Sequence, residues 1–141
     1  MNDPFDLQRF VDAQQDVYEQ ALQELRAGRK RTHWMWFIFP QLSGLGRSAM
    51  AQRYAISGRD EALAYLQHAL LGPRLQACTE AMLAHAGDSA LQILGRPDDL
   101  KFHSSMTLFA CIAPDPALFD KALEVFFRGQ PDPASLEQLK A

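Results

Sequence analysis

Residues 97–112 of this chain read PDDLKFHSSMTLFACI, and this stretch decides the fold. Its second half, from Met106 to Ile112, is apolar on nearly every face of a helix, which is typical of a helix surrounded by other helices. Its first half, from Asp98 to Ser105, is mostly polar. We therefore expect a central buried helix over about residues 97–112, whose polar end leaves the core and forms the floor of a pocket.

Proline, glycine and apolar spacing predict further helices on both sides of this one. Three Asp-Pro pairs are typical of helix starts, because proline at the first helical position gives up no hydrogen bond. They are Asp3-Pro4, Asp115-Pro116 and Asp132-Pro133. Left-handed glycines are expected to end helices at Gly28, Gly87 and Gly129. The apolar spacing predicts helices over about residues 6–27, 34–39, 48–54, 59–69, 73–86 and 97–112, one that ends at 128, and a short terminal one.

The composition bounds the class of protein. With a formal net charge of −3 over 141 residues, extended binding along nucleic acid is not expected. No apolar run approaches the roughly 20 residues of a membrane span, and the acidic start at Met1 lacks the layout of a signal peptide. Cys78 and Cys111 fall at apolar helix positions and are expected to be buried, reduced thiols. We expect a soluble, cytoplasmic protein with no membrane partner, a single all-α domain over residues 1–141. The sequence does not fix its oligomeric state.

The most unusual composition lies in residues 29–41, which read RKRTHWMWFIFPQ. We expect a short buried helix from Trp34 to Phe39, capped by Thr32, because no second strand is predicted to pair with this segment. Residues two apart on a helix point about 200° from one another, so at least one tryptophan belongs to the core. Trp34 is nearer the polar end and is expected to face a pocket. The alternative is that both Trp34 and Trp36 are core anchors with bonded indole N–H groups.

Several stretches of this chain resemble one known family. They are His33–Leu42, Gly44–Gly46, Tyr54–Ile56, Glu61–Ala62 with Tyr65–Leu66, Leu71–Leu75, and Lys101 with Ser104–Phe109. From about Phe10 to Leu139 the chain resembles the uncharacterised bacterial family labelled domain of unknown function 1810. The resemblance implies a compact all-helical domain and implies no activity. Members sometimes carry the label calpastatin, but nothing in this sequence supports protease inhibition. Thr32 stands where the family is expected to have serine.

Candidate ligand contacts gather around the aromatic run. The loop Gly44–Ser48 leads into a predicted helix, whose free backbone N–H groups would suit a phosphate or carboxylate together with Arg47. The alternative is a tight turn with Ser48 as the helix N-cap. Gln14 interrupts an apolar stripe and is a weaker candidate for a pocket amide. The predicted ligand-binding residues are Lys30, His33, Trp34, Gly44, Gly46, Arg47, Ser48, Tyr54, Lys101, Ser104 and Ser105.

Catalytic groups are less clearly marked. His33, which we expect to be neutral beside three cations, and Lys101 are weak candidates for a general base or an anion contact. The alternatives are a histidine that structures the first helical turn and a lysine in a surface ion pair with Asp98 or Asp99. The histidines and cysteines show no spacing of metal ligands, so we expect no metal, and no cofactor motif is present. Whether the protein is an enzyme stays open.

These observations lead to one favoured function and two alternatives. We expect binding of a small anionic, aromatic, nucleotide-like ligand at residues 33–41 and 44–48. The first alternative is a protein-interaction module or homodimer that uses the same aromatic surface. The second is a structural domain whose aromatic run is core packing. A concave pocket with convergent polar groups favours the ligand, whereas a flat apolar patch favours the interface.

Overall fold

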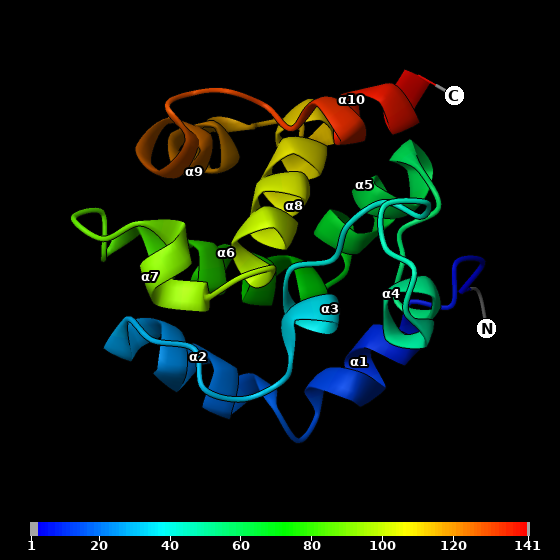
Figure 1. Ribbon diagram of the computed structural model, residues 1–141. Helices are drawn as coiled ribbons and strands as arrows, with labels where there is room; N and C mark the ends of the chain where they lie inside the picture. The colour runs from blue at the N-terminus through cyan, green and yellow to red at the C-terminus, as the bar shows by residue number, and fades with distance from the viewer. Residues whose placement is uncertain (1–2, 141) are drawn as a thin grey trace.

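The computed structural model describes residues 3–140, and over this range the chain is built from helices (Figure 1). They are α1 (Gln8–Gln14), α2 (Tyr18–Ala27), α3 (Met35–Ile38), α4 (Ala49–Arg53), α5 (Arg59–Gln67), α6 (Leu71–Leu83), α7 (Ala90–Leu94), α8 (Asp98–Ile112), α9 (Ala117–Phe127) and α10 (Pro133–Lys140). Within the described range the only strand-like pairing is an isolated bridge between Leu42 and Ile56. The predicted all-α class is confirmed.

Helix α8 is the centre of the fold. It contacts α5, α7, α9 and α10, and Figure 1 shows it between α9 and α10 on one side and α1, α2 and α3 on the other. Phe102, Met106, Leu108 and Phe109 on this helix are fully buried. A helix with apolar side chains on every face buries them all only if other elements pack around it on every side. The prediction of a central helix over about 97–112 is confirmed.

The prediction of one continuous helix over about residues 6–27 is wrong, because two helices occupy this span. Helix α1 ends at Gln14 and α2 begins at Tyr18. The Gln14 side chain is buried, and its amide donates to the carbonyl oxygen of Phe37 at 2.6 Å and to the Tyr65 hydroxyl at 3.1 Å. The break lets α1 pack against α3 while α2 packs against α6. Gln14 thus holds the core together and lines none of the pockets described below.

Helix α7 was not predicted, although its signal is present in the sequence. Ser89 and Gln92 form a capping box, in which the Gln92 N–H donates to Ser89 Oγ at 3.0 Å and the Ser89 N–H donates to Gln92 Oε1 at 2.7 Å. The expectation of a left-handed glycine at Gly87 is wrong. Helix α6 ends at Leu83 with Ala84, in a right-handed conformation, as its C-cap. Gly95, which follows α7, has a φ of 80°, and Gly28 and Gly129 have positive φ as predicted.

The aromatic helix is shorter than predicted. Helix α3 has four residues and begins after Trp34, so Thr32 does not cap it. Instead the Thr32 hydroxyl donates to Glu24 Oε2 at 2.7 Å and fastens the preceding loop to α2. The capping role assigned to Thr32 is therefore wrong, because a carboxylate from another helix offers its hydroxyl a charged acceptor.

The two cysteines differ in their surroundings. Cys78 is buried as predicted, and burial raises the pKa of its thiol to about 12. The prediction of burial for Cys111 is wrong, because the last turn of α8 turns this side chain toward solvent. No helix in the described part of the chain combines the length and apolar character that crossing a membrane requires.

Candidate functional site

A pocket of about 340 Å³ lies where three distant segments meet. We call it the junction pocket. The loop after α3 contributes Gln41, Leu45 and Gly46, the start of α8 contributes Pro97, Leu100, Lys101, His103 and Ser104, and the start of α10 contributes Asp132 and Ala134. The polar half of α8 thus forms one wall of a pocket, as its sequence predicts.

The loop between α3 and α4 is shaped by backbone pairing and glycine. The Ser43 N–H donates to the Ile56 carbonyl at 2.8 Å, and the Ile56 N–H donates to the Gln41 carbonyl at 2.9 Å. At Gly46 a Cβ atom would lie 2.5 Å from the Ala51 Cβ and 3.1 Å from Gln41 Nε2, too close for any side chain. Gly46 therefore lets the loop fold back on α4 and places Gln41 and Leu45 at the pocket.

The start of α4 fits a tight turn better than an anion cradle. Ser48 Oγ accepts a hydrogen bond from the Ala51 N–H at 3.1 Å, which makes Ser48 the N-cap of a helix of five residues. Arg47 and Ser48 are exposed and do not line the junction pocket. Gly44 has a φ of 91° and packs under the Gln138 amide of α10. These contacts agree with the alternative hypothesis for this loop, a tight turn in which Ser48 is the N-cap of the following helix.

Two lysines and one aspartate link the aromatic run to α8. Lys30 Nζ lies 2.9 Å from Asp98 Oδ2, and its side chain is only 8% exposed. Lys101 Nζ lies 3.7 Å from Asp98 Oδ1, and its side chain is 23% exposed. Lys30 covers the Trp34 ring at 5.0 Å and Lys101 covers the Trp36 ring at 4.8 Å. Lys30 is thereby engaged in structure, whereas Lys101 has a long ion pair and reaches the junction pocket.

Asp132 provides the opposite charge in the same pocket. Its Oδ2 accepts hydrogen bonds from the hydroxyls of Ser104 and Ser135, both at 2.7 Å, and its backbone N–H donates to Thr107 Oγ1 at 2.8 Å. Burial opposes ionisation of this carboxyl, but the hydrogen bonds from Ser135 and Ser104 outweigh it and lower its pKa. Asp132 is thus a fixed carboxylate. The sequence marked it only as a helix start.

His103 is a second residue that sequence reasoning missed. Its Nε2 lies 2.7 Å from the Gln130 carbonyl oxygen, so Nε2 carries a proton and donates it to this acceptor. The ring stacks on Phe127, with centroids 4.0 Å apart and planes 7° from parallel. Both contacts hold the imidazole in one orientation at the edge of the junction pocket. A stacked partner 24 positions along the chain leaves no local signal in the sequence.

The two tryptophans occupy the reverse of the expected places. Trp34 is 1% exposed, and its indole N–H donates to Glu24 Oε1 at 3.0 Å. Trp36 is only half-buried, and its indole N–H finds no partner within residues 3–140. The expectation that Trp34 faces a pocket is wrong, because the Glu24 carboxylate inside the core satisfies its polar atom.

The remaining predicted residues lie apart from the junction pocket. His33 is exposed. Tyr54 is buried, with its ring 5.2 Å from that of Phe37 and 5.8 Å from that of Phe10. Ser105 is fully buried within α8. The structure thus brings together Gly46, Lys101 and Ser104 of the predicted set. It does not bring to this pocket Lys30, His33, Trp34, Gly44, Arg47, Ser48, Tyr54 or Ser105.

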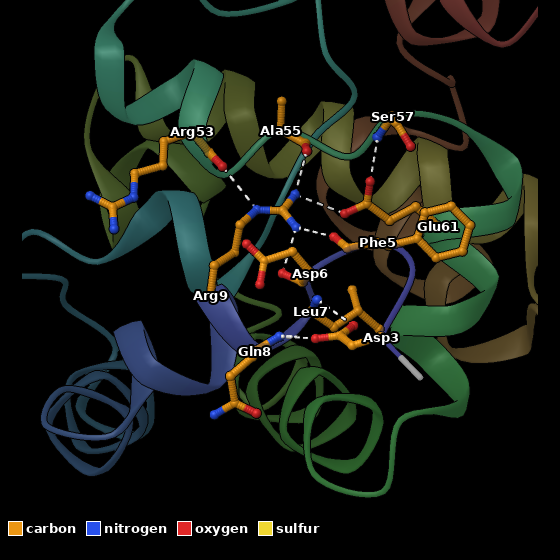
Figure 2. A network of polar contacts seen from close by, with 10 residues as sticks. All are labelled: Asp3, Phe5, Asp6, Leu7, Gln8, Arg9, Arg53, Ala55, Ser57 and Glu61. Atoms are coloured by element: carbon orange, nitrogen blue, oxygen red, sulfur yellow. Dashed lines mark hydrogen bonds and ion pairs between the residues drawn. The ribbon is translucent and has the colours of Figure 1, made fainter. Parts of the chain in front are cut away.

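Two other hollows of similar volume contain carboxylates that serve the fold. One of about 450 Å³ contains Asp3, whose carboxylate accepts the N–H groups of Leu7 and Gln8 at 2.8 and 3.0 Å. One of about 420 Å³ contains Glu61, which pairs with Arg9 at 2.8 Å. Figure 2 shows how these groups form one network that fixes the N-terminal segment. The predicted helix start at Asp3-Pro4 is wrong, because α1 begins at Gln8 and Leu7 is its N-cap residue. Asp3 instead binds the N–H groups of Leu7 and Gln8, and neither carboxylate is left for a ligand.

The fold has a close structural relative. The crystal structure of the conserved hypothetical protein Rv1873 from Mycobacterium tuberculosis is 53% identical in sequence, with a TM-score of 0.96 and coverage of 99% of both chains. No curated protein matches the chain. The sequence profile of the family described as "Protein of unknown function (DUF1810)" matches residues 4–139, so the resemblance seen in the sequence is confirmed and the chain belongs to this family.

Proposed function

We propose that this protein binds a small anionic ligand with a flat apolar part, of the size and chemistry of a mononucleotide, in the junction pocket. One observation supports this most. Lys101, Asp132 and Gln41 come from three segments that are far apart in the sequence, and all three line the same concavity. Convergent polar groups in a concave site are typical of small-molecule binding.

The size of the pocket limits the ligand. Its volume of about 340 Å³ lies near the lower end of the roughly 300–1,000 Å³ found for ligand sites. A sugar phosphate or a mononucleotide fits this range, whereas a dinucleotide would extend beyond it.

The lining suits a ligand with one charged and one apolar part. Lys101 offers an ammonium group whose pairing with Asp98 is long at 3.7 Å, so an anionic ligand group can compete for it. Leu100 is 52% exposed and lies beside Lys101 at the pocket, where Leu45 also contributes. A flat apolar group against these leucines would bury surface that now faces water.

The aromatic surface required by the interaction hypothesis is largely absent from the exterior. Trp34, Phe37 and Phe39 are buried, and Trp36 is half-buried. The proposal therefore rests on the junction pocket and not on an aromatic patch.

Thermal unfolding in the presence of ligands tests the proposal. The panel contains ribonucleoside monophosphates, sugar phosphates and inorganic phosphate, with NAD and ADP-ribose as larger comparison compounds. A true ligand at 100 times its dissociation constant stabilises the native protein by about 2.7 kcal/mol, a clear rise in Tm. We expect Lys101→Met to abolish this rise while its methylene stem still covers Trp36.

Lys121→Met is the matched control, since Lys121 is exposed on α9 and does not line the junction pocket. It should keep the full ligand-induced rise in Tm. The proposal fails if no compound of the panel raises the Tm of the wild-type protein, or if Lys101→Met retains the whole effect.

A further inference from the structure

We propose that Asp132 is a specificity-determining residue that accepts a hydrogen bond from a ligand hydroxyl, so that the junction pocket selects ribose over 2′-deoxyribose phosphates. This inference rests on the proposed function of the pocket. It adds the identity of the ligand group that contacts Asp132.

The first step concerns the two oxygens of the Asp132 carboxylate. Oδ2 accepts three hydrogen bonds, from the Ser104 hydroxyl, the Ser135 hydroxyl and the Ser135 N–H at 2.7, 2.7 and 3.3 Å. Oδ1 receives no hydrogen bond from any residue in the range 3–140. The carboxylate therefore has one oxygen that is used by the fold and one that is free to accept a donor from a ligand.

The second step concerns the rigidity of this carboxylate. The Asp132 N–H is bonded to Thr107 Oγ1 at 2.8 Å, and the carbonyl of Gln130, two residues earlier, accepts from His103 at 2.7 Å. The turn before α10 is thus bound to α8 at its backbone as well as through the side chain. An acceptor held this firmly loses little conformational entropy on binding, which favours discrimination between ligands.

The third step concerns the kind of donor. A carboxylate accepts hydrogen bonds only, so the ligand must present a hydroxyl or an amine. Oδ2 already receives three donors, which spread much of the negative charge, and Lys101 lies in the same pocket. A neutral hydroxyl suits this surrounding better than an ammonium group, which would approach a cation in a confined volume.

The fourth step joins the three parts of the lining. Lys101 provides a contact for a phosphate, Asp132 a contact for hydroxyls, and Leu45 with Leu100 a surface for a flat ring. Phosphate, sugar and base occur in this combination in a ribonucleoside monophosphate. A site that hydrogen-bonds a substrate hydroxyl discriminates strongly against the analogue without it, because its polar group is then left unpaired.

Isothermal titration calorimetry with paired ligands tests the inference. The pairs are AMP, GMP, CMP and UMP with their 2′-deoxy forms, and ribose 5-phosphate with 2-deoxyribose 5-phosphate. For the wild-type protein we expect the ribose form to bind at least about 10-fold more tightly. Asp132→Asn retains an acceptor that can cap α10 but not the charge, and should reduce this ratio to less than about 3-fold.

Asp120→Asn is the matched control, because it makes the same chemical change at an exposed residue of α9 that does not line the pocket. It should keep the preference for ribose. Equal binding of the ribose and deoxyribose forms by the wild-type protein overturns the inference while the proposed function stands. This outcome is measured on the wild-type protein alone and does not depend on whether a variant folds. A preference for ribose that is retained in Asp132→Asn also overturns the inference. Glycine and other amino acids are titrated for comparison, and tighter binding of any of them than of every phosphate compound overturns it as well. Failure of every panel compound to bind overturns both proposals.

Discussion

At the scale of single residues, Glu24 shows how a charged group can organise an apolar region. It is 4% exposed, and its carboxylate accepts hydrogen bonds from the N–H groups of Arg31 and Thr32, the Thr32 hydroxyl, the Trp34 indole and the Gln20 amide. A buried carboxylate is tolerated when its lone pairs are satisfied in this way. Glu24 thereby orders the loop that carries the basic residues and seats Trp34 in the core.

Substitution of Glu24 by Gln should destabilise the protein by about 2–4 kcal/mol. The NH₂ group of glutamine replaces a carboxylate oxygen and only donates, so the N–H and O–H groups bonded to that oxygen lose their acceptor. The free energy of unfolding in urea measures this change. Glu19→Gln, an exposed change on the same helix, is the control and should stay within about 0.5 kcal/mol of the wild type. Equal effects of the two substitutions would contradict the role given to Glu24.

The stabilisation by Glu24 should also depend on pH. Burial opposes its ionisation, but the hydrogen bonds from Arg31, Thr32 and Gln20 prevail and lower its pKa from 4.5 to about 2. A folded-state pKa below that of the unfolded chain means that the stabilisation is fully present above pH 4.5 and is lost as the pH falls toward 2. The difference in unfolding free energy between wild type and Glu24→Gln should therefore shrink between pH 6 and pH 2.5. A constant difference would show that the carboxylate is not the source.

At the scale of elements, the docking of α10 on α8 is decided by a few polar contacts. Thr107 on α8 donates its hydroxyl to the His103 carbonyl of its own helix at 2.8 Å and accepts the Asp132 N–H, also at 2.8 Å. Ser104, one turn earlier, binds the Asp132 carboxylate. These contacts close one wall of the junction pocket. Helical periodicity in the sequence does not predict them.

Thr107→Val should destabilise the protein by about 1–2 kcal/mol, since it leaves the Asp132 N–H without an acceptor. Thr79→Val is the matched control, because Thr79 is also fully buried but bonds only to the Leu75 carbonyl of its own helix at 2.8 Å. Its replacement should be nearly neutral. Hydrogen exchange of the Asp132 amide should accelerate in Thr107→Val and not in Thr79→Val. Unchanged exchange at Asp132 would rule out this docking contact.

At the scale of the whole molecule, aromatic rings connect the helices across the core. Phe10 of α1 meets Tyr65 of α5 at 5.1 Å, Tyr65 meets Phe109 of α8 at 5.7 Å, and Phe109 meets Phe119 of α9 at 5.7 Å. A fourth contact joins Phe39 to Phe102 of α8 at 4.9 Å. Edge-to-face and tilted pairs at these distances add to the burial of apolar surface, and they tie four helices to one another.

The exchanged places of the two tryptophans can be tested at this scale. Trp34→Ala should destabilise the protein by about 3–5 kcal/mol, because it opens a cavity in the core and leaves Glu24 short of a donor. Trp36→Ala should destabilise it clearly less, since its ring is half-buried and its indole N–H has no partner within residues 3–140. Denaturant unfolding of both variants gives the comparison. A larger effect at Trp36 would contradict the packing described.

Local and periodic features of the sequence were sufficient to predict several parts of this protein. The all-round apolar half of α8, the Ser48 cap and the left-handed Gly28 depend on residues within a few positions of one another. Of the junction pocket, Gly46, Lys101 and Ser104 were predicted from the glycine loop and from the polar end of α8. Helix periodicity and caps act over one or two turns, so a single sequence carries their signal.

Only the tertiary structure decided the features that depend on contacts between distant positions. The Ser104–Asp132 bond joins residues 28 apart, and the Gln14–Phe37 bond that accompanies the break between α1 and α2 joins residues 23 apart. The burial of Trp34 rather than Trp36 depends on the Glu24 carboxylate of another helix. By itself the sequence determined the helical class, the central helix and the polar end that lines a pocket, because these follow from local periodicity and capping. The partners of each buried polar group, and with them the Asp132 end of the pocket, follow from how the helices pack, since hydrogen bonds in a core are satisfied wherever packing brings a partner.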